Sequence, residues 1–212
     1  MRLVHADRRW AGRCIVAASG PSLTEEAAAL CRGEHVIAVN DAYRRLPWAD
    51  VLYACDLAWW RHHEFCTGFA GERWTTHSLS PKNDKRTIDD ALGLRIIEGA
   101  DGQGFSRDLA RIHYASNSGF QAVNLALLFG ADPVVLVGFD MREVDRKRHF
   151  FGSHPAPLRD GHSFAPWIAG FARAADLLGK FPRIINATPG SALTCFPMMP
   201  LAAALTQAGQ AA

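Results

Sequence analysis

The chain has 212 residues, of which 49% are hydrophobic and 21% charged, so it can bury a substantial core and lacks the composition of a disordered protein. Lysine and arginine outnumber aspartate and glutamate by 23 to 21, an excess too small for a protein whose binding is driven by a nucleic-acid backbone. No apolar stretch approaches the roughly 20 residues of a membrane span, and the five cysteines contain no CxxC pair, so we expect a single cytoplasmic domain over residues 1–212.

The first part of the chain predicts three short buried strands, over residues 13–18, 35–39 and 51–54. Each run is apolar and is followed by turn residues. The first strand leads into the loop Ser19-Gly20-Pro21-Ser22. Ser22 opens an S-x-x-E capping box, which predicts a helix immediately after it.

The second part shows no firm period between residues 61 and 92, but a further strand is predicted over 94–97. Residues 117–129 are apolar on almost every side, as in a helix sandwiched within a fold, and Val134–Val137 predicts a central strand. A long polar loop follows, and we expect residues 141–163 to form a lid, because loops of that length are usually functional or disordered. The remaining predictions are a helix over 164–178, a strand over 183–186 and a helix from Leu201.

Strands that alternate with helices predict an α/β fold. We expect a Rossmann-like, doubly wound, mostly parallel sheet in one domain, with the long polar loop after the central strand. Ligands of such sheets bind at the carboxyl ends of the strands. The polar clusters predicted to lie there, or at the start of the buried helix, are Ser19, Gly20, Pro21 and Ser22; Asn40 and Asp41; Asp56; Asn117, Ser118 and Gly119; and Asp140.

These clusters favour an anionic ligand such as a nucleotide. Helix starts after Ser22 and Ser118 would offer unpaired backbone N–H groups and a positive dipole end, which suit a phosphate or carboxylate. Asn40, Asp41 and Asp56 could hydrogen-bond a ribose, a base or a sugar hydroxyl. The alternative is that these residues only cap helices or end strands. The sequence has no GxxxxGK[ST] motif and no GxGxxG motif after the first strand, which argues against a P-loop NTPase and a dinucleotide-binding protein.

Three histidines, His149, His154 and His162, lie in or beside the polar loop. One of them could act as a general base, because imidazole titrates near neutral pH. A metal site with a nearby carboxylate and a set of solvated loop histidines are the alternatives, although the spacing matches no zinc motif. The arginines of the same loop, Arg142 and Arg148 among them, form either a solvated face or a phosphate clamp.

The chain contains an ordered set of six short motifs: VAASGPSL (16–23), VIAVND (36–41), ADVLYACD (49–56), NSGFQAVNLALLFGA (117–131), VVLVGFDM (134–141) and GHS (161–163). In this order they resemble the bacterial sialyltransferases of glycosyltransferase family 42, and equally the wider group of motility accessory factor glycosyltransferases and archaeal hydroxymethylpterin diphosphokinase-like proteins. Two further segments, HFFGSHP (149–155) and INATPGSALTCFP (185–197), are similar to phage and prophage proteins of unassigned function.

The resemblance implies roles for individual residues. The loop 19–22, Asn40 with Asp41 beside it, and Ser118 would contact the nucleotide of the donor, and His162 would be the general base. The family needs no metal. Two tyrosines that stabilise the departing phosphate in the family have no counterpart in residues 141–151, so Arg142, Arg148 or His149 would replace them.

The leading hypothesis is a nucleotide-sugar-binding glycosyltransferase that transfers a sugar, from a donor that could be CMP-linked, to a hydroxyl of a glycan or other acceptor. No further cofactor is expected, and homo-oligomerisation is left open. If the chain is phage encoded, it would act in the host cytoplasm.

One alternative is a diphosphokinase-like enzyme that uses nucleoside triphosphate and Mg²⁺ held by Asp41, Asp56 or Asp140. The other is a non-catalytic phage accessory protein.

Overall fold

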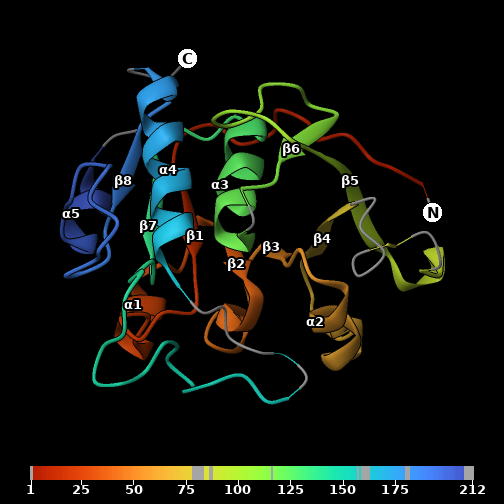
Figure 1. The fold of residues 1–212 in the computed structure, drawn as a ribbon, viewed down its shortest axis with the longest axis horizontal. Coiled ribbons are helices and arrows are strands. Elements are labelled where there is room, and N and C mark those ends of the chain that lie inside the picture. The colour runs from red at the N-terminus through yellow and green to blue at the C-terminus, as the bar shows by residue number, and fades with distance from the viewer. Residues whose placement is uncertain are drawn as a thin grey trace.

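The computed structural model describes residues 2–77, 84–85, 88–115, 117–156, 158, 163–179 and 182–207. Within these residues one eight-stranded sheet has the order β6-β5-β4-β3-β2-β1-β7-β8, and every neighbouring pair of strands is parallel. Helices cover both faces (Figure 1), so the predicted α/β, Rossmann-like, doubly wound fold in one domain is confirmed. The strands are β1 Cys14–Ala17, β2 His35–Val39, β3 Val51–Tyr53, β4 Glu72–His77, β5 Leu94–Ala100, β6 Arg111–His113, β7 Val134–Val137 and β8 Ile184–Asn186. The helices are α1 Glu25–Leu30, α2 Leu57–His62, α3 Ser118–Leu128, α4 Ala165–Leu178 and α5 Leu201–Thr206, with short 3₁₀ helices that include η1 Asn40–Arg44.

The sheet has a topological switch point between β1 and β7. In chain order, β2 to β6 follow β1 in succession on one side of it, and the chain then crosses through α3 to place β7 on the other side of β1. Val16 of β1 lies opposite Leu136 of β7, and Ala17 lies opposite Val137. At such a point the connections after the two strands leave toward opposite faces, which opens a crevice beyond their carboxyl ends.

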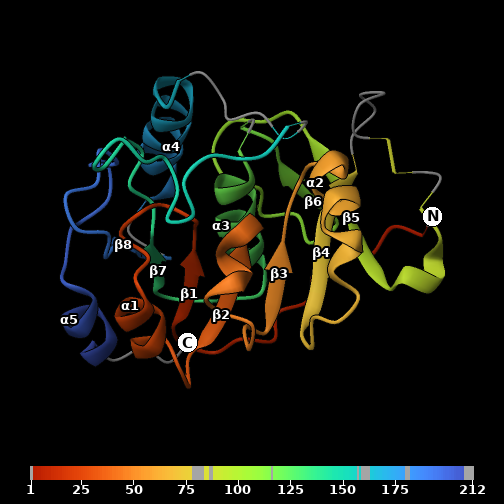
Figure 2. The same ribbon diagram turned by 90° about the horizontal axis from the view of Figure 1, so that it is seen from below.

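The strand side chains alternate between two hydrophobic cores. Val16 and Leu136 pack with α3 and α4, whereas Ile15 and Val135 pack with α1, α2 and α5. Figure 1 shows α3 and α4 above the sheet and α1 and α2 below it, and Figure 2 gives the view from below. Burial of both faces explains why the central strands are almost continuously apolar.

Helix α3 is tied to its surroundings by buried polar side chains that an apolar helix would lack. Asn124, fully buried, accepts the backbone N–H groups of Ser106 at 2.9 Å and His113 at 3.1 Å. Gln121 accepts the hydroxyl hydrogen of Tyr53 at 2.7 Å. These bonds fix α3, and therefore its first turn, relative to β3 and β6.

The structure differs from the predicted elements in a few places. Strands β4 and β6 and helix α2 were not predicted. Strand β7, expected at the centre, is buried on both faces but lies second from one edge of the sheet. Helix α1 begins at Glu25, and its cap is Thr24, whose hydroxyl accepts the N–H of Ala27 at 3.1 Å. Ser22 is therefore not the cap of this helix. No helix of the described residues is long and apolar enough to cross a membrane.

Candidate functional site

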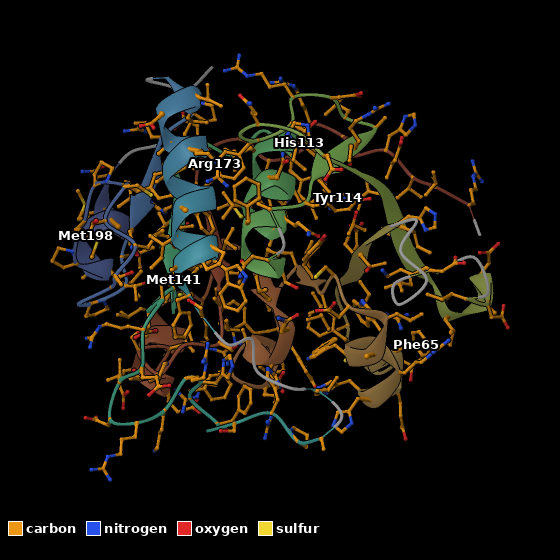
Figure 3. The ribbon with its side chains drawn as sticks, in the orientation of Figure 1. Phe65, His113, Tyr114, Met141, Arg173 and Met198 are labelled. Carbon is orange, nitrogen blue, oxygen red and sulfur yellow. The ribbon has the colours of Figure 1, made fainter. Side chains whose placement is uncertain are left out.

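A cleft of about 520 Å³ opens at the carboxyl ends of the strands, beside the β1–β7 switch point. Met141, after β7, and Tyr114, after β6, both line it and are labelled on either side of α3 in Figure 3. Most of the residues predicted from sequence meet here, although they come from segments far apart in the chain. Those that line the cleft are Ser19, Gly20, Asn40, Asp56, Asn117, Ser118, Gly119, Asp140, Arg148, His149 and His154.

The loop after β1 folds directly onto Asp140. The backbone N–H of Gly20 donates to the carbonyl of Gly138 at 3.0 Å, and a Cβ atom on Gly20 would overlap that carbonyl and the Asp140 carboxylate. Ser22 donates its hydroxyl to Oδ2 of Asp140 at 2.7 Å, and its backbone N–H at 3.4 Å. Only glycine at position 20 therefore allows this close approach. Pro21 and Ser22 themselves do not line the cleft.

Asp140 is a buried carboxylate with one unpartnered oxygen. The residue is 2% exposed, and Oδ1 has no hydrogen-bond partner among the described residues. Burial raises the pKa of Asp140, and the bonds from Ser22 oppose this increase in part. Asp140 lines the cleft, and its buried Oδ1 carries a cost in desolvation that no described group offsets.

The first turn of α3 forms another wall of the cleft. Its cap is Asn117 rather than Ser118, because Oδ1 of Asn117 accepts the N–H of Phe120 at 2.9 Å. The Ser118 hydroxyl accepts the backbone N–H of Cys55 at 3.1 Å, which joins α3 to the end of β3. A Cβ atom on Gly119 would lie 2.8 Å from the ring of Phe139. The positive end of this helix thus faces the cleft.

The start of α1 is unsuited to an anion, contrary to the prediction. The helix has only six residues, and Glu25 and Glu26 occupy its first turn. Their carboxylates already complement the positive end of the helix and would repel a phosphate. Of the two predicted helix starts, only that of α3 belongs to the cleft.

Asp41, predicted to contact the nucleotide, lies behind the cleft and does not line it. It is 3% exposed, and its Oδ2 accepts the indole N–H of Trp59 at 2.9 Å. The side chains of Arg44, His63 and His154 approach the same carboxylate to 3.6, 3.7 and 3.9 Å. The 3₁₀ geometry of η1 turns Asp41 toward α2 and the polar loop, so it supports their positions.

The first half of the polar loop packs against the loop after β1. The backbone N–H of Phe150 donates to the carbonyl of Ser19 at 3.0 Å, and Nδ1 of His149 lies 3.1 Å from the Ser19 hydroxyl. The His149 ring stacks on Phe151 at a centroid distance of 5.0 Å and lies 4.7 Å from the ring of His154. These contacts bring two of the three predicted histidines into the cleft. His162 lies outside the described residues.

The two arginines predicted to bind phosphate lie in different places. Nε of Arg142 donates to the carbonyl of Gly190 at 2.6 Å, and the side chain does not line the cleft. Arg148 does line it, with its guanidinium 4.2 Å from the ring centroid of Phe164. One of its nitrogens, Nη2, is buried without a hydrogen-bond partner among the described residues. Arg148 is therefore the better placed of the two to meet an anion.

Several residues near the cleft were missed by sequence reasoning. Lys85 is buried next to β3, and its ammonium donates to the carbonyl of Cys55 at 2.9 Å. Burial lowers its pKa to about 8, against the opposing effects of Cys55 and Asp56. Lys85 lies in a stretch without helical or strand periodicity, so its burial near the cleft could not be predicted from the sequence. The missed residues that line the cleft include Thr76, Asp101, Tyr114, Phe164 and Trp167.

No group of three or more histidine, cysteine, aspartate or glutamate side chains suited to a metal ion occurs in the part of the chain that the structure describes.

Comparisons with known proteins give one informative similarity. No family model and no curated protein sequence matches the chain. Among solved structures, the fold is similar to that of the MAf glycosyltransferase from Magnetospirillum magneticum AMB-1, with a TM-score of 0.61 and 14% sequence identity. The match covers 99% of this chain and 36% of that one, so the chain spans about a third of its relative's length. At this identity the similarity shows a shared fold.

We expect Gly20→Ala to lower the free energy of unfolding by about 1–3 kcal/mol, because the added methyl group must displace the Asp140 carboxylate or the Gly138 carbonyl. Gly68→Ala is the matched control, since no atom lies within 4 Å of a Cβ built there. Urea unfolding of both variants measures the difference. Equal stability of the two variants would contradict the close packing of the first loop on Asp140.

We expect Lys85→Met to flatten the pH dependence of stability between pH 8 and 10.5. The pKa of Lys85 is about 8 in the folded chain, against an ordinary value of 10.5. Between these values the unfolded state holds more protons, so the wild type gains stability as the pH rises; below pH 8 both states are protonated and the contribution is constant.

Unfolding free energies measured across this range test the effect as a difference between the two proteins. The tyrosines and cysteines whose pKa values burial raises, such as Tyr53 and Cys31, titrate in both proteins and cancel in the comparison. Cys55 would not cancel, because Lys85 lowers the pKa of its thiol, so both proteins carry Cys55→Ser. Parallel pH profiles for wild type and variant would contradict a buried ammonium at position 85.

Proposed function

We propose that the chain is a glycosyltransferase-type protein that binds a nucleotide-sugar donor in the cleft. The observation that carries the proposal is the convergence of the β1 loop, Asn40, Asp56 and the first turn of α3 on one cleft at the switch point. The fold similarity to the MAf glycosyltransferase supports this class of reaction. A volume of about 520 Å³ lies within the range of roughly 300–1,000 Å³ that is usual for small-molecule sites.

The donor's phosphate would lie against the first turn of α3, where the backbone N–H groups near Ser118 and Gly119 and the helix dipole favour an anion. Arg148, with its unpartnered guanidinium nitrogen, would offset charge on the leaving nucleotide. Asn40 and Asp56 would hydrogen-bond the ribose or the base. A CMP-linked donor and a sialyltransferase-like reaction are the finer form of this proposal, and the reaction would take place in the cytoplasm, that of the host if the chain is phage encoded.

In the transfer step an acceptor hydroxyl oxygen would attack the anomeric carbon of the donor sugar. The bond from that carbon to the phosphate oxygen breaks, and the nucleotide leaves with the electron pair. A histidine ring nitrogen takes the acceptor's proton. His162 is the residue proposed for this role, with His149 and His154, which both line the cleft, as alternatives.

A thermal-shift screen tests the binding step. Cytidine, uridine, guanosine and adenosine mono-, di- and triphosphates are added with and without Mg²⁺. We expect nucleotides of one base to stabilise the protein without Mg²⁺, by about 2.7 kcal/mol at 100 times the dissociation constant. Stabilisation only by a triphosphate with Mg²⁺ would instead indicate the diphosphokinase-like enzyme. No stabilisation by any nucleotide would reject the proposal and favour an accessory protein.

Histidine variants test the transfer step. His162→Ala should lower the rate of sugar transfer by roughly 10²- to 10⁴-fold while the nucleotide still raises the melting temperature, because a general base acts on the acceptor rather than the donor. His149→Ala and His154→Ala are measured in parallel, and His62→Ala, at an exposed position of α2, is the control. Full activity in all three variants, His162→Ala, His149→Ala and His154→Ala, would exclude these histidines as the base.

A further inference from the structure

The unpartnered oxygen of Asp140 is the strongest single pointer to what the cleft binds. Asp140 is 2% exposed and lines the cleft, and among the described residues only Oδ2 has hydrogen-bond partners. Leaving Oδ1 buried and unsatisfied is costly, and more so for a charged group. Groups of this kind are retained where a ligand completes them.

The loops after β1 and β7 form one end of the cleft. The wall there is negatively charged because it contains the carboxylate of Asp140. Gly20 lies against the carboxylate, where a Cβ atom would overlap Oδ2, and Ser22 holds Oδ2 through its hydroxyl and its N–H. Arg142, the cation that acts on Asp140, has its Nε bonded to the carbonyl of Gly190. A phosphate placed beside Oδ1 would therefore meet a carboxylate rather than a cation.

The first turn of α3 offers the opposite charge at another position. Ser118 joins that turn to Cys55 at the end of β3, and two strands, β2 and β1, separate β3 from β7 in the sheet. Asp56 also lines the cleft toward β3, but the ammonium of Lys85, bonded to the carbonyl of Cys55, acts on its carboxylate there. The cleft therefore has a positive helix end with a balanced carboxylate toward β3, and the carboxylate of Asp140 toward β7. An extended ligand with an anionic part and a hydroxyl-rich part can satisfy both.

We propose that Oδ1 of Asp140 accepts a hydrogen bond from a hydroxyl group of the ligand, and that Asp140 thereby excludes phosphate from the loop after β1. This inference rests on the proposed nucleotide-sugar site and adds the direction in which the ligand lies. The sugar or ribose hydroxyls face Gly20 and Asp140, and the phosphate faces α3. It also replaces the expectation that the loop 19–22 cradles a phosphate.

The first arm of the test needs no ligand. Asp140→Asn keeps the shape and an oxygen for the Ser22 hydroxyl but removes the buried charge, so the melting temperature of the ligand-free protein should rise. Ser22→Ala is the matched control: it removes the donor to Oδ2 and should lower the melting temperature. A fall in Asp140→Asn as large as that in Ser22→Ala would make Asp140 a structural residue and overturn the inference. This arm reports on Asp140 even if no nucleotide binds.

The second arm measures affinity for the nucleotide found by the screen. Wild type and Asp140→Ala are titrated with the nucleotide, its 2′-deoxy and 3′-deoxy forms and the corresponding nucleotide-sugar. Loss of a hydrogen bond to a charged acceptor should weaken binding roughly 10- to 100-fold. The effect should disappear for the ligand that lacks the contacted hydroxyl. If only the nucleotide-sugar is affected, the hydroxyl belongs to the transferred sugar rather than to the ribose.

Two outcomes of the second arm would overturn the inference. Tighter binding of the nucleoside monophosphate by Asp140→Ala would place the phosphate beside this residue. Stabilisation of the wild type by Mg²⁺ alone, lost in Asp140→Ala, would assign Oδ1 to a cation. Absence of any nucleotide binding, combined with a higher melting temperature for Asp140→Asn, would reject the proposed donor and leave Asp140 as a buried charge. Titration with ribose and free monosaccharides then decides: binding that Asp140→Ala abolishes would support a ligand hydroxyl at Oδ1, and no binding would overturn the inference.

Discussion

The parallel pairing of β1 with β7 is the constraint on which the rest of the site depends. The pairing continues past the strands, because Ala18 donates its N–H to Val137 at 2.8 Å and Gly20 donates to Gly138 at 3.0 Å. Gly138 has a φ of +73°, and a Cβ atom there would overlap the carbonyl of Ala18. Two glycines thus let the loops after both strands approach each other, which sets Asp140 against the first loop.

Two residues of the cleft have a buried polar atom without a partner among the described residues, namely Asp140 and Arg148. Such an atom raises the free energy of the folded state. Unpartnered atoms also occur outside the cleft, for example on Thr75 and Arg183, whereas the buried Asn124 of α3 has its partners. Asp140 and Arg148 are distinguished because they combine an unpartnered atom with a place in the wall of the cleft.

The central part of the fold could be predicted because the relevant strands are buried on both faces. Val134–Val137 has no polar residue to obscure its period, whereas β4, with the sequence ERWTTH, carries polar side chains and β6 has only three residues. The clustering of the site residues could be predicted, because ligands of parallel sheets bind at the carboxyl ends of the strands. The orientation of each side chain could not be predicted in this way. Whether Asp41 faces the ligand or Trp59 depends on the turn of a short 3₁₀ helix, and the S-x-x-E pattern at Ser22 did not reveal that Thr24 would be the cap.

The loop after β1 connects the two functions proposed for the cleft. Its Ser22 holds the carboxylate of Asp140, and its Ser19 contacts both the backbone of Phe150 and the ring of His149. A displacement of this short loop would move the group that orients the donor and one of the groups that could accept a proton. A proton acceptor must lie within about 3 Å of the hydroxyl that it activates. Because Asp140 and His149 both contact this loop, the loop fixes the distance between the proposed donor contact and the possible base. The first half of the polar loop is thereby positioned by the loop after β1, which forms part of the proposed donor site.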